Sequence, residues 1–196
     1  MTDRRPAPPG VRVWAEAELP AGIARQIAEL EAEAWPGSAP GHDPELAPKV
    51  MALVGEDGTV AASLALLFKD IRHAGRTYRA AGLSAVVTRS GLRGRGYGGR
   101  LVEAARHELT GAGAVDLVLF SCDRPLVPFY AAAGFTPLPG SVLVGGTPED
   151  PLTTADPGFD KVVLAAVPPR SEDAVDLRVF RGARIGLYPG AVDRLW

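Results

Sequence analysis

Hydrophobic residues in the first half of the chain fall into strand-length runs separated by short polar turns. Residues 11–19 predict a strand, and residues 21–35 predict an amphipathic helix because their apolar residues recur at helical spacing. Three more strands are expected at residues 50–54, 59–71 and 76–88, joined by turns that contain Asp-Gly and Ala-Gly. The last of them ends in a nearly continuous apolar run, so we predict an antiparallel meander with a buried centre.

Beyond this meander the pattern changes to alternating helices and strands. A helix is expected at residues 98–109, a strand at 115–121 and a helix at 125–133. A last pair of strands follows at residues 141–144 and 159–167. Gly, Pro and acidic residues dominate the connection between these two strands, which indicates a mobile surface loop.

The length of 196 residues and the hydrophobic content of 46% fit one globular domain whose core needs no disulfide or metal. We expect this domain to span residues 11–196, after a disordered leader at residues 1–10. The leader lacks the apolar segment of a secretory signal, and the longest nearly apolar run, residues 60–68, is too short to cross a bilayer. The sequence therefore predicts a cytoplasmic protein that does not cross a membrane.

Cysteine and histidine are too few and too scattered for a disulfide framework or a metal site. Cys122 is the single cysteine, and His42, His73 and His107 lie far apart with no spacing typical of metal ligands. We therefore predict neither an internal disulfide nor a metal cofactor.

The formal charge of -2 conceals an uneven distribution of charge along the chain. Residues 72–106 contain eight arginines, no lysine and one acidic residue, whereas residues 146–196 contain eight acidic residues against six basic ones. This asymmetry suggests two kinds of partner, although a chance scatter of solvated charges gives the same counts. Nucleic acid is the alternative partner for the arginines, and the absence of lysine and an isoelectric point below neutral argue against it.

A loop rich in glycine and arginine follows the last strand of the meander and opens the next helix. Glycines let a backbone approach a ligand closely, and the unpaired N–H groups at a helix start attract anions, so the loop predicts a phosphate-binding site. Residues 94–99 also match the G-x-G-x-x-G dinucleotide fingerprint. A Rossmann fold, however, needs an acidic residue at the end of the next strand, whereas here Asp116 stands at the start of that strand. A Walker loop is excluded because no Gly-Lys-Ser or Gly-Lys-Thr is present.

Two motifs in the correct order resemble the GNAT superfamily of N-acetyltransferases. Its pyrophosphate loop, Arg/Gln-x-x-Gly-x-Gly/Ala, is matched by Arg93, Gly96 and Gly98, and its Phe-Tyr-x-x-x-Gly-Phe signature by residues 129–135. The resemblance covers roughly residues 50–145. It implies an α+β fold with a mixed, mostly antiparallel central sheet, flanked by helices and splayed open at an acetyl-CoA site.

The same resemblance implies how acetyl-CoA, the expected cosubstrate, binds. Backbone groups of the strand before the loop would pair with the pantetheine arm like an added strand, and N–H groups of the loop would hold the pyrophosphate. The cofactor-binding residues predicted in this way are Val86, Val87, Thr88, Arg93, Gly94, Arg95, Gly96, Tyr97 and Gly98. Tyr130 is predicted to protonate the departing thiolate as a general acid, and the alternative role for it is that of a core aromatic residue.

The C-terminal third resembles the aminoglycoside 2′-N-acetyltransferases. The shared features are Pro-Gly-Ser-Val-Leu at residues 139–143, an acidic loop that ends in Asp-Pro-Gly at residues 156–158, and the ending Asp-Arg-Leu-Trp. In that family a C-terminal tryptophan carboxylate and a nearby aspartate help to bind a cationic antibiotic, so the segment 139–196 is expected to bind the acceptor. The acceptor-binding residues predicted in this way are Ser121, Asp156, Asp193 and Trp196. Packing of the chain terminus is the alternative role of the tryptophan.

One position departs from the family pattern at the expected catalytic centre. Where members have a glutamate nine positions before the loop arginine, this chain has Ser84, which is no comparable base. Three alternatives stay open: a water relay through backbone carbonyls and Ser84, an acid such as Asp43 or Asp156 in place of the glutamate, or a different substrate.

The sequence thus predicts an acetyl-CoA-dependent N-acetyltransferase whose acceptor is a small cationic amine. An aminoglycoside antibiotic is the expected acceptor, modified at its 2′-amino group. The alternatives are acetylation of a peptide N-terminus or a metabolite amine, and a weakly catalytic acyl-CoA-binding module, which the missing glutamate favours. Similar N-acetyltransferases often form homodimers, but no residue pattern here indicates an oligomeric state.

Overall fold

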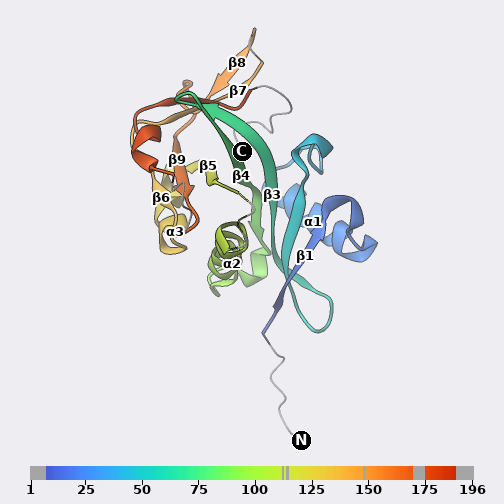
Figure 1. Cartoon of the computed structure of the whole chain (residues 1–196). Helices are drawn as coiled ribbons and strands as arrows, with labels where there is room; N and C mark the ends of the chain where they lie inside the picture. Colours follow the sequence, from blue (N-terminus) through green and yellow to red (C-terminus); the bar gives the residue numbers. More distant parts are fainter. Residues whose placement is uncertain (1–7, 112, 114, 148, 170–174, 189–196) are drawn as a thin grey trace, which may run out of the picture.

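A computed structural model describes residues 8–111, 113, 115–147, 149–169 and 175–188 of the chain. Within these residues a seven-stranded sheet forms the centre of the molecule, and every neighbouring pair in it is antiparallel except one (Figure 1). Its strands, in their order across the sheet, are β1 (Gly10–Ala15), β2 (Lys49–Val54), β3 (Val60–His73), β4 (Arg76–Thr88), β5 (Leu117–Asp123), β9 (Lys161–Ala166) and β6 (Thr136–Pro137). The parallel pair is β4 and β5. The predicted α+β fold with a mixed, mostly antiparallel sheet is therefore confirmed.

Helices cover both faces of the large sheet. Those of the described residues are α1 (Ala21–Ala34), α2 (Tyr97–Gly111) and α3 (Val127–Ala132). Because neighbouring residues of a strand point to opposite faces, β2 divides its apolar side chains between two buried clusters. Ala52 packs with Ile27 and Leu30 of α1, whereas Leu53 belongs to the cluster that contains Leu101 and Ala105 of α2. None of the described helices is long and apolar enough to span a membrane.

The predicted last pair of strands is wrong as a pair. The first of them is β7 (Val142–Gly146), which lies in a second sheet between β8 (Pro151–Thr153) and β10 (Arg184–Gly186), whereas the second is β9, which pairs with β5 and β6. The connection between them, expected to be a loop, contains β8 and turns back on β7 as a hairpin. An apolar run predicts a strand but not its partner, and the burial of β9 places it inside the large sheet.

The second sheet reaches the large sheet through the far end of the β3–β4 hairpin. This hairpin turns at Ala74 and Gly75, which both have positive φ, as a two-residue turn of the tight I′ type requires. Phe180, in the short 3₁₀ helix Leu177–Phe180 that precedes β10, stacks on His73 and meets Tyr78 edge to face. Aromatic packing therefore fixes the C-terminal part of the described chain to the end of β3 and β4.

The end of α3 is held to α2 by one arginine. The Arg106 Nε atom donates a hydrogen bond to the carbonyl oxygen of Ala133 over 2.7 Å. The next residue, Gly134, has φ +91°, and a Cβ atom there would lie only 2.7 Å from the same Nε. Glycine is therefore required at this position, both for its left-handed backbone and for the space that the guanidinium occupies.

Gly134→Ala should accordingly lower the free energy of unfolding by about 2–3 kcal/mol, because it adds the cost of a left-handed alanine to the loss of the Arg106 hydrogen bond. Chemical denaturation followed by circular dichroism measures this change. Gly58→Ala is the matched control, since Gly58 also has positive φ (+77°) but nothing within 4 Å of the added Cβ. Equal losses for the two variants would show that Arg106 contributes nothing.

Candidate active site

β4 and β5 run side by side for only two residues each and then separate. The parallel ladder pairs Ala80 with Leu117 and Ala81 with Val118. Beyond it β5 continues with β9 alone and β4 with β3 alone among the described strands. The sheet is therefore splayed, as the resemblance implied, and the unpaired facing edges of β4 and β5 form an opening in which an extended ligand can add as a strand.

A β-bulge lies on β4 inside this opening. Between the pairs Ala65–Ser84 and Ser63–Val87, one residue of β3 faces two residues of β4. The first of the two, Ala85, has φ +49°, a left-handed conformation that costs an alanine about 1–2 kcal/mol. The bulge changes the direction in which β4 presents its side chains and backbone groups, so that Ser84 and Ala85 both line one cavity.

The glycine-rich loop connects the end of β4 to the start of α2. Gly94 and Gly96 have positive φ, at +77° and +80°, and the Arg100 N–H donates to the Gly96 carbonyl at 3.0 Å as the helix begins. The earlier N–H groups of the first helical turn have no partner within the helix, so they can bind an anion. A Cβ atom on Gly98 would lie 2.8 Å from the Thr88 hydroxyl, which explains why a glycine stands where α2 meets the end of β4.

Most of the arginines around this loop brace the fold. Arg89 donates to the Val60 carbonyl at 2.8 Å, and Arg100 donates to the Pro9 carbonyl at 2.6 Å. Together with Arg106 these side chains tie separate segments to each other. The arginine side chains of the loop that stay exposed are those of Arg93 and Arg95, although the Arg93 Nε atom donates to the Thr88 carbonyl at 3.2 Å.

Tyr130 of α3 lies beside the opening in an aromatic cluster. Its ring meets Phe120 and Phe129 edge to face, with centroids 5.1 and 5.0 Å apart. Burial raises the pKa of the phenol, and the nearby Cys122 and Asp123 raise it further. The hydroxyl makes no hydrogen bond to any other described residue, and the raised pKa keeps the phenol protonated.

The thiol of Cys122 is unsuited to nucleophilic attack. It lies on β5 and is buried, and burial raises its pKa to about 11, with Asp123 adding to the increase and Lys161 opposing it. A thiol with so high a pKa carries almost no thiolate near neutral pH. Ser121, the preceding residue, lies opposite Val163 of β9 and is half-buried.

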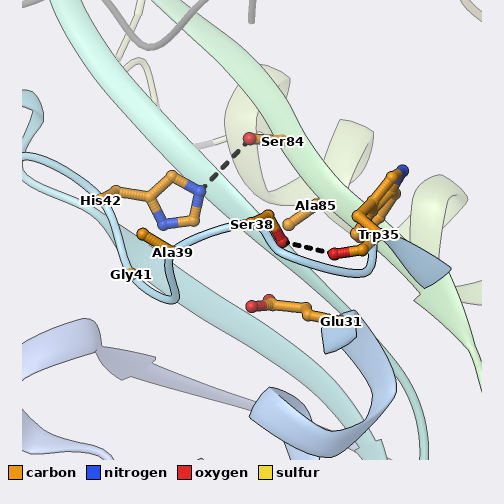
Figure 2. Close-up of a pocket in the computed structure, with 8 residues that line it drawn as sticks. All are labelled: Glu31, Trp35, Ser38, Ala39, Gly41, His42, Ser84 and Ala85. Atoms are coloured by element: carbon orange, nitrogen blue, oxygen red, sulfur yellow. Dashed lines mark hydrogen bonds between the residues drawn. The ribbon is translucent and has the colours of Figure 1, made fainter. Parts of the chain in front are cut away.

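A cavity of about 150 Å³ lies next to the bulge, between β4, the end of α1 and the loop that follows α1 (Figure 2). Its lining consists of Glu31, Trp35, Ser38, Ala39, Gly41, His42, Ser84 and Ala85. The Glu31 side chain enters it from α1, and burial raises the pKa of this carboxyl, with His42 opposing the increase and Glu16 adding to it. Trp35 is 41% exposed and presents an aromatic surface at the rim.

A chain of hydrogen bonds ends at this cavity. The carboxylate of Glu16 lies 2.8 Å from the His42 Nδ1 atom and also accepts the His42 backbone N–H at 3.0 Å. On the other side of the ring, His42 Nε2 lies 3.2 Å from the Ser84 hydroxyl. Sequence reasoning missed Glu16, Glu31, Trp35 and His42 as site residues. No local pattern in the sequence marks these four residues, because they come from separate segments of the chain.

The other predicted site residues are placed differently. Asp156 accepts hydrogen bonds from the Thr153 hydroxyl and N–H, both at 2.7 Å, which lower its pKa, and it does not line the cavity beside Ser84. Asp43 caps a short 3₁₀ helix by accepting the Glu45 N–H. Asp193 and Trp196 lie outside the described residues. Over the described residues no three His, Cys, Asp or Glu side chains are grouped so as to hold a metal ion.

Comparisons with known proteins agree with this geometry. Residues 14–135 match the model of the acetyltransferase (GNAT) family. Similar solved structures include an acyl-CoA N-acyltransferase from Pseudomonas aeruginosa, at 19% identity and a TM-score of 0.55 over 81% of this chain and 99% of that one. ElaA from Escherichia coli is 14% identical with a TM-score of 0.55, over 80% of this chain and 98% of that one. A chimera of Vibrio cholerae spermidine N-acetyltransferase SpeG and hSSAT is 16% identical with a TM-score of 0.53, over 80% of this chain and 95% of that one.

The solved structures share the fold, and a search of curated protein sequences gives no significant match. The family match, in contrast, spans well over half of the chain and includes β4, the glycine-rich loop and Tyr130. This chain therefore belongs to the GNAT acetyltransferase family and is an acyl-CoA-dependent N-acyltransferase.

Proposed function

We propose that this enzyme transfers the acetyl group of acetyl-CoA to an amino group of a small cationic acceptor. The observation that carries the proposal is the bulge at Ala85, which borders the opening between β4 and β5 and also lines the Glu31 cavity. A thioester in the opening and an amine in the cavity would meet at this bulge. Holding both reactants in contact is the main contribution that direct acyl transfer needs from a protein.

The described residues fit the expected cosubstrate. Val86, Val87 and Thr88 lie on the part of β4 that β5 does not pair with, where the pantetheine arm would add as a strand. The N–H groups at the start of α2, with the exposed Arg93 and Arg95, are suited to the phosphates. Acetyl-CoA supplies the acetyl group as an activated thioester.

Tyr130 is proposed as the general acid. Its phenol is buried, remains protonated because burial raises its pKa, and has no described hydrogen-bond partner to compete for its proton. α3 also places the neighbouring Phe129 within 3.5 Å of a Cβ atom built on Gly98, so the phenol lies close to the loop proposed to hold the pyrophosphate. A sulfur leaving group in the opening would receive its proton from this hydroxyl.

The cavity is suited to bind one end of a cationic acceptor molecule. Its volume of about 150 Å³ is below the roughly 300–1,000 Å³ of sites that enclose a drug-sized ligand, so it suits a single ring or chain end. A cation beside Glu31 would offset the desolvation that raises the pKa of this carboxyl, and Trp35 can stack on a ring. An aminoglycoside has this chemistry. The resemblance of residues 139–196 to aminoglycoside 2′-N-acetyltransferases supports it, with Ser121, Asp193 and Trp196 as proposed acceptor contacts.

Tyr130→Phe should lower kcat about 100-fold, within the range of a lost general acid, and leave the affinity for acetyl-CoA unchanged. The phenyl ring keeps the contacts with Phe120 and Phe129, so folding should be preserved. Steady-state thiol release and calorimetric titration measure the two quantities. Because the pKa of Tyr130 is raised, its phenol stays protonated at pH 9, and the defect should persist there. Tyr78→Phe is the control, and a Tyr130→Phe enzyme with wild-type kcat would contradict the assignment.

Turnover with an acceptor panel tests the acceptor class. Thiol release from acetyl-CoA should be detected with aminoglycosides that carry a 2′-amino group and should fall to background with analogues that carry a 2′-hydroxyl. Mass spectrometry should show one added acetyl group. If the protein binds acetyl-CoA but acetylates only peptides or uncharged amines, the aminoglycoside assignment fails.

Glu31→Gln should raise the KM for a cationic acceptor about tenfold, because it removes the charge and keeps the shape of the side chain. The KM for acetyl-CoA should not change. Glu29→Gln is a matched control, since Glu29 is exposed on the same helix outside the cavity. Equal KM values for the two variants would remove Glu31 from acceptor binding.

A further inference from the structure

The hydrogen-bonded chain of Glu16, His42 and Ser84 has no part in the function proposed above. Its members come from separate parts of the chain: Glu16 follows β1, His42 lies in the loop after α1, and Ser84 is the residue before the bulge of β4. The His42 side chain is only 7% exposed and that of Glu16 21%. A buried imidazole held on both sides has one orientation, which is what a proton acceptor needs.

The partners of His42 fix which ring nitrogen carries the hydrogen. A carboxylate only accepts hydrogen bonds, so the Nδ1 atom that faces Glu16 at 2.8 Å must be the protonated one. The Nε2 atom then has a lone pair and accepts the hydrogen bond of the Ser84 hydroxyl at 3.2 Å. Glu16 also holds the His42 backbone N–H, so it positions the residue as well as the ring.

We propose that His42 is the base that accepts the proton of the acceptor amine, that Ser84 relays this proton, and that Glu16 is a positioning residue. The inference rests on the proposed function, because it needs an amine in the cavity that Ser84 and His42 both line. This relay would explain how the enzyme deprotonates its substrate although β4 carries a serine in place of a basic side chain.

The proton transfers balance as follows. An N–H proton of the acceptor ammonium passes to the Ser84 Oγ atom while the hydroxyl proton of Ser84 passes to His42 Nε2, and Glu16 stabilises the imidazolium. The freed lone pair of the nitrogen then forms the C–N bond to the carbonyl carbon, and the C–S bond breaks with its electron pair on sulfur. The sulfur takes the proton of Tyr130. The second proton that the nitrogen releases restores the phenol through solvent.

The other acidic side chains considered for this role are less suited to it. Asp43 is used as a helix cap and Asp156 is bound to Thr153. Glu31 lines the same cavity from α1, but the group hydrogen-bonded to Ser84 beside the bulge is His42. Among the described residues, the charged groups near His42 include Glu16 and Glu31, and Arg25 lines the adjoining cavity.

His42→Gln should lower kcat about 100-fold and leave acetyl-CoA affinity unchanged. The loss should be measured at saturating acceptor, where kcat falls and the KM for acetyl-CoA does not change. His107→Gln, on the exposed face of α2, is the matched control. A wild-type kcat for His42→Gln, or a kcat lowered equally by His107→Gln, would overturn the proposal.

Variants of Ser84 test the relay. Ser84→Ala should lower kcat to a similar degree, whereas Ser84→Thr keeps a hydroxyl and should recover most of the activity. Full activity of Ser84→Ala would exclude the relay. Mass spectrometry after incubation with acetyl-CoA alone should find no acetyl group on Ser84. An acetylated Ser84 would make it a nucleophile and overturn its assignment as a relay.

A readout that does not depend on turnover separates this inference from the proposed function. Nitrogen NMR of the histidine rings in the free protein should show His42 protonated at Nδ1, and Glu16→Gln should disturb this state. A ring protonated at Nε2 would overturn the proposal even in an active enzyme. If wild-type protein acetylates no amine while His42 has the expected tautomer, it is the proposed function that fails.

Discussion

The two-residue pairing of β4 with β5 is the constraint on which the rest of the site depends. Backbone N–H and C=O groups in a sheet must find partners, so a strand that leaves its neighbour early exposes an edge that an extended ligand can satisfy. β5 turns away to pair with β9, and β4 remains with β3. Because of the bulge at Ala85, residues of β4 border both the opening and the Glu31 cavity.

Packing around this opening accounts for part of the arginine cluster at residues 72–106. Three of the eight arginines in this cluster serve as braces: Arg89 and Arg100 bind carbonyl groups of distant segments, and Arg106 holds the end of α3. Gly98 lets α2 begin against Thr88 and Phe129. A high local density of arginine thus reflects the need to hold two helices beside an opened sheet, and only part of it faces the loop.

Much of the fold could be predicted because its signals are local. The strand at residues 76–88, the glycine-rich loop and the helix that carries Tyr130 each have a pattern of their own, and the structure contains all three. The partners of β7 and β9 were mispredicted because strand pairing is decided by tertiary burial. His42 was missed for the same reason, since its partners Glu16 and Ser84 lie 26 and 42 positions away in the sequence. Each of these side chains is unremarkable until the fold brings it to the others.

The central claim is that the opening between β4 and β5 holds acetyl-CoA at the bulge. Backbone hydrogen exchange of the full chain, measured by mass spectrometry with and without acetyl-CoA, tests it most directly. The account predicts slower exchange at residues 86–88 and at residues 94–98, where added hydrogen bonds would protect the amides, and little change on the exposed face of α1. Unchanged exchange in both segments at a saturating concentration of acetyl-CoA would contradict it.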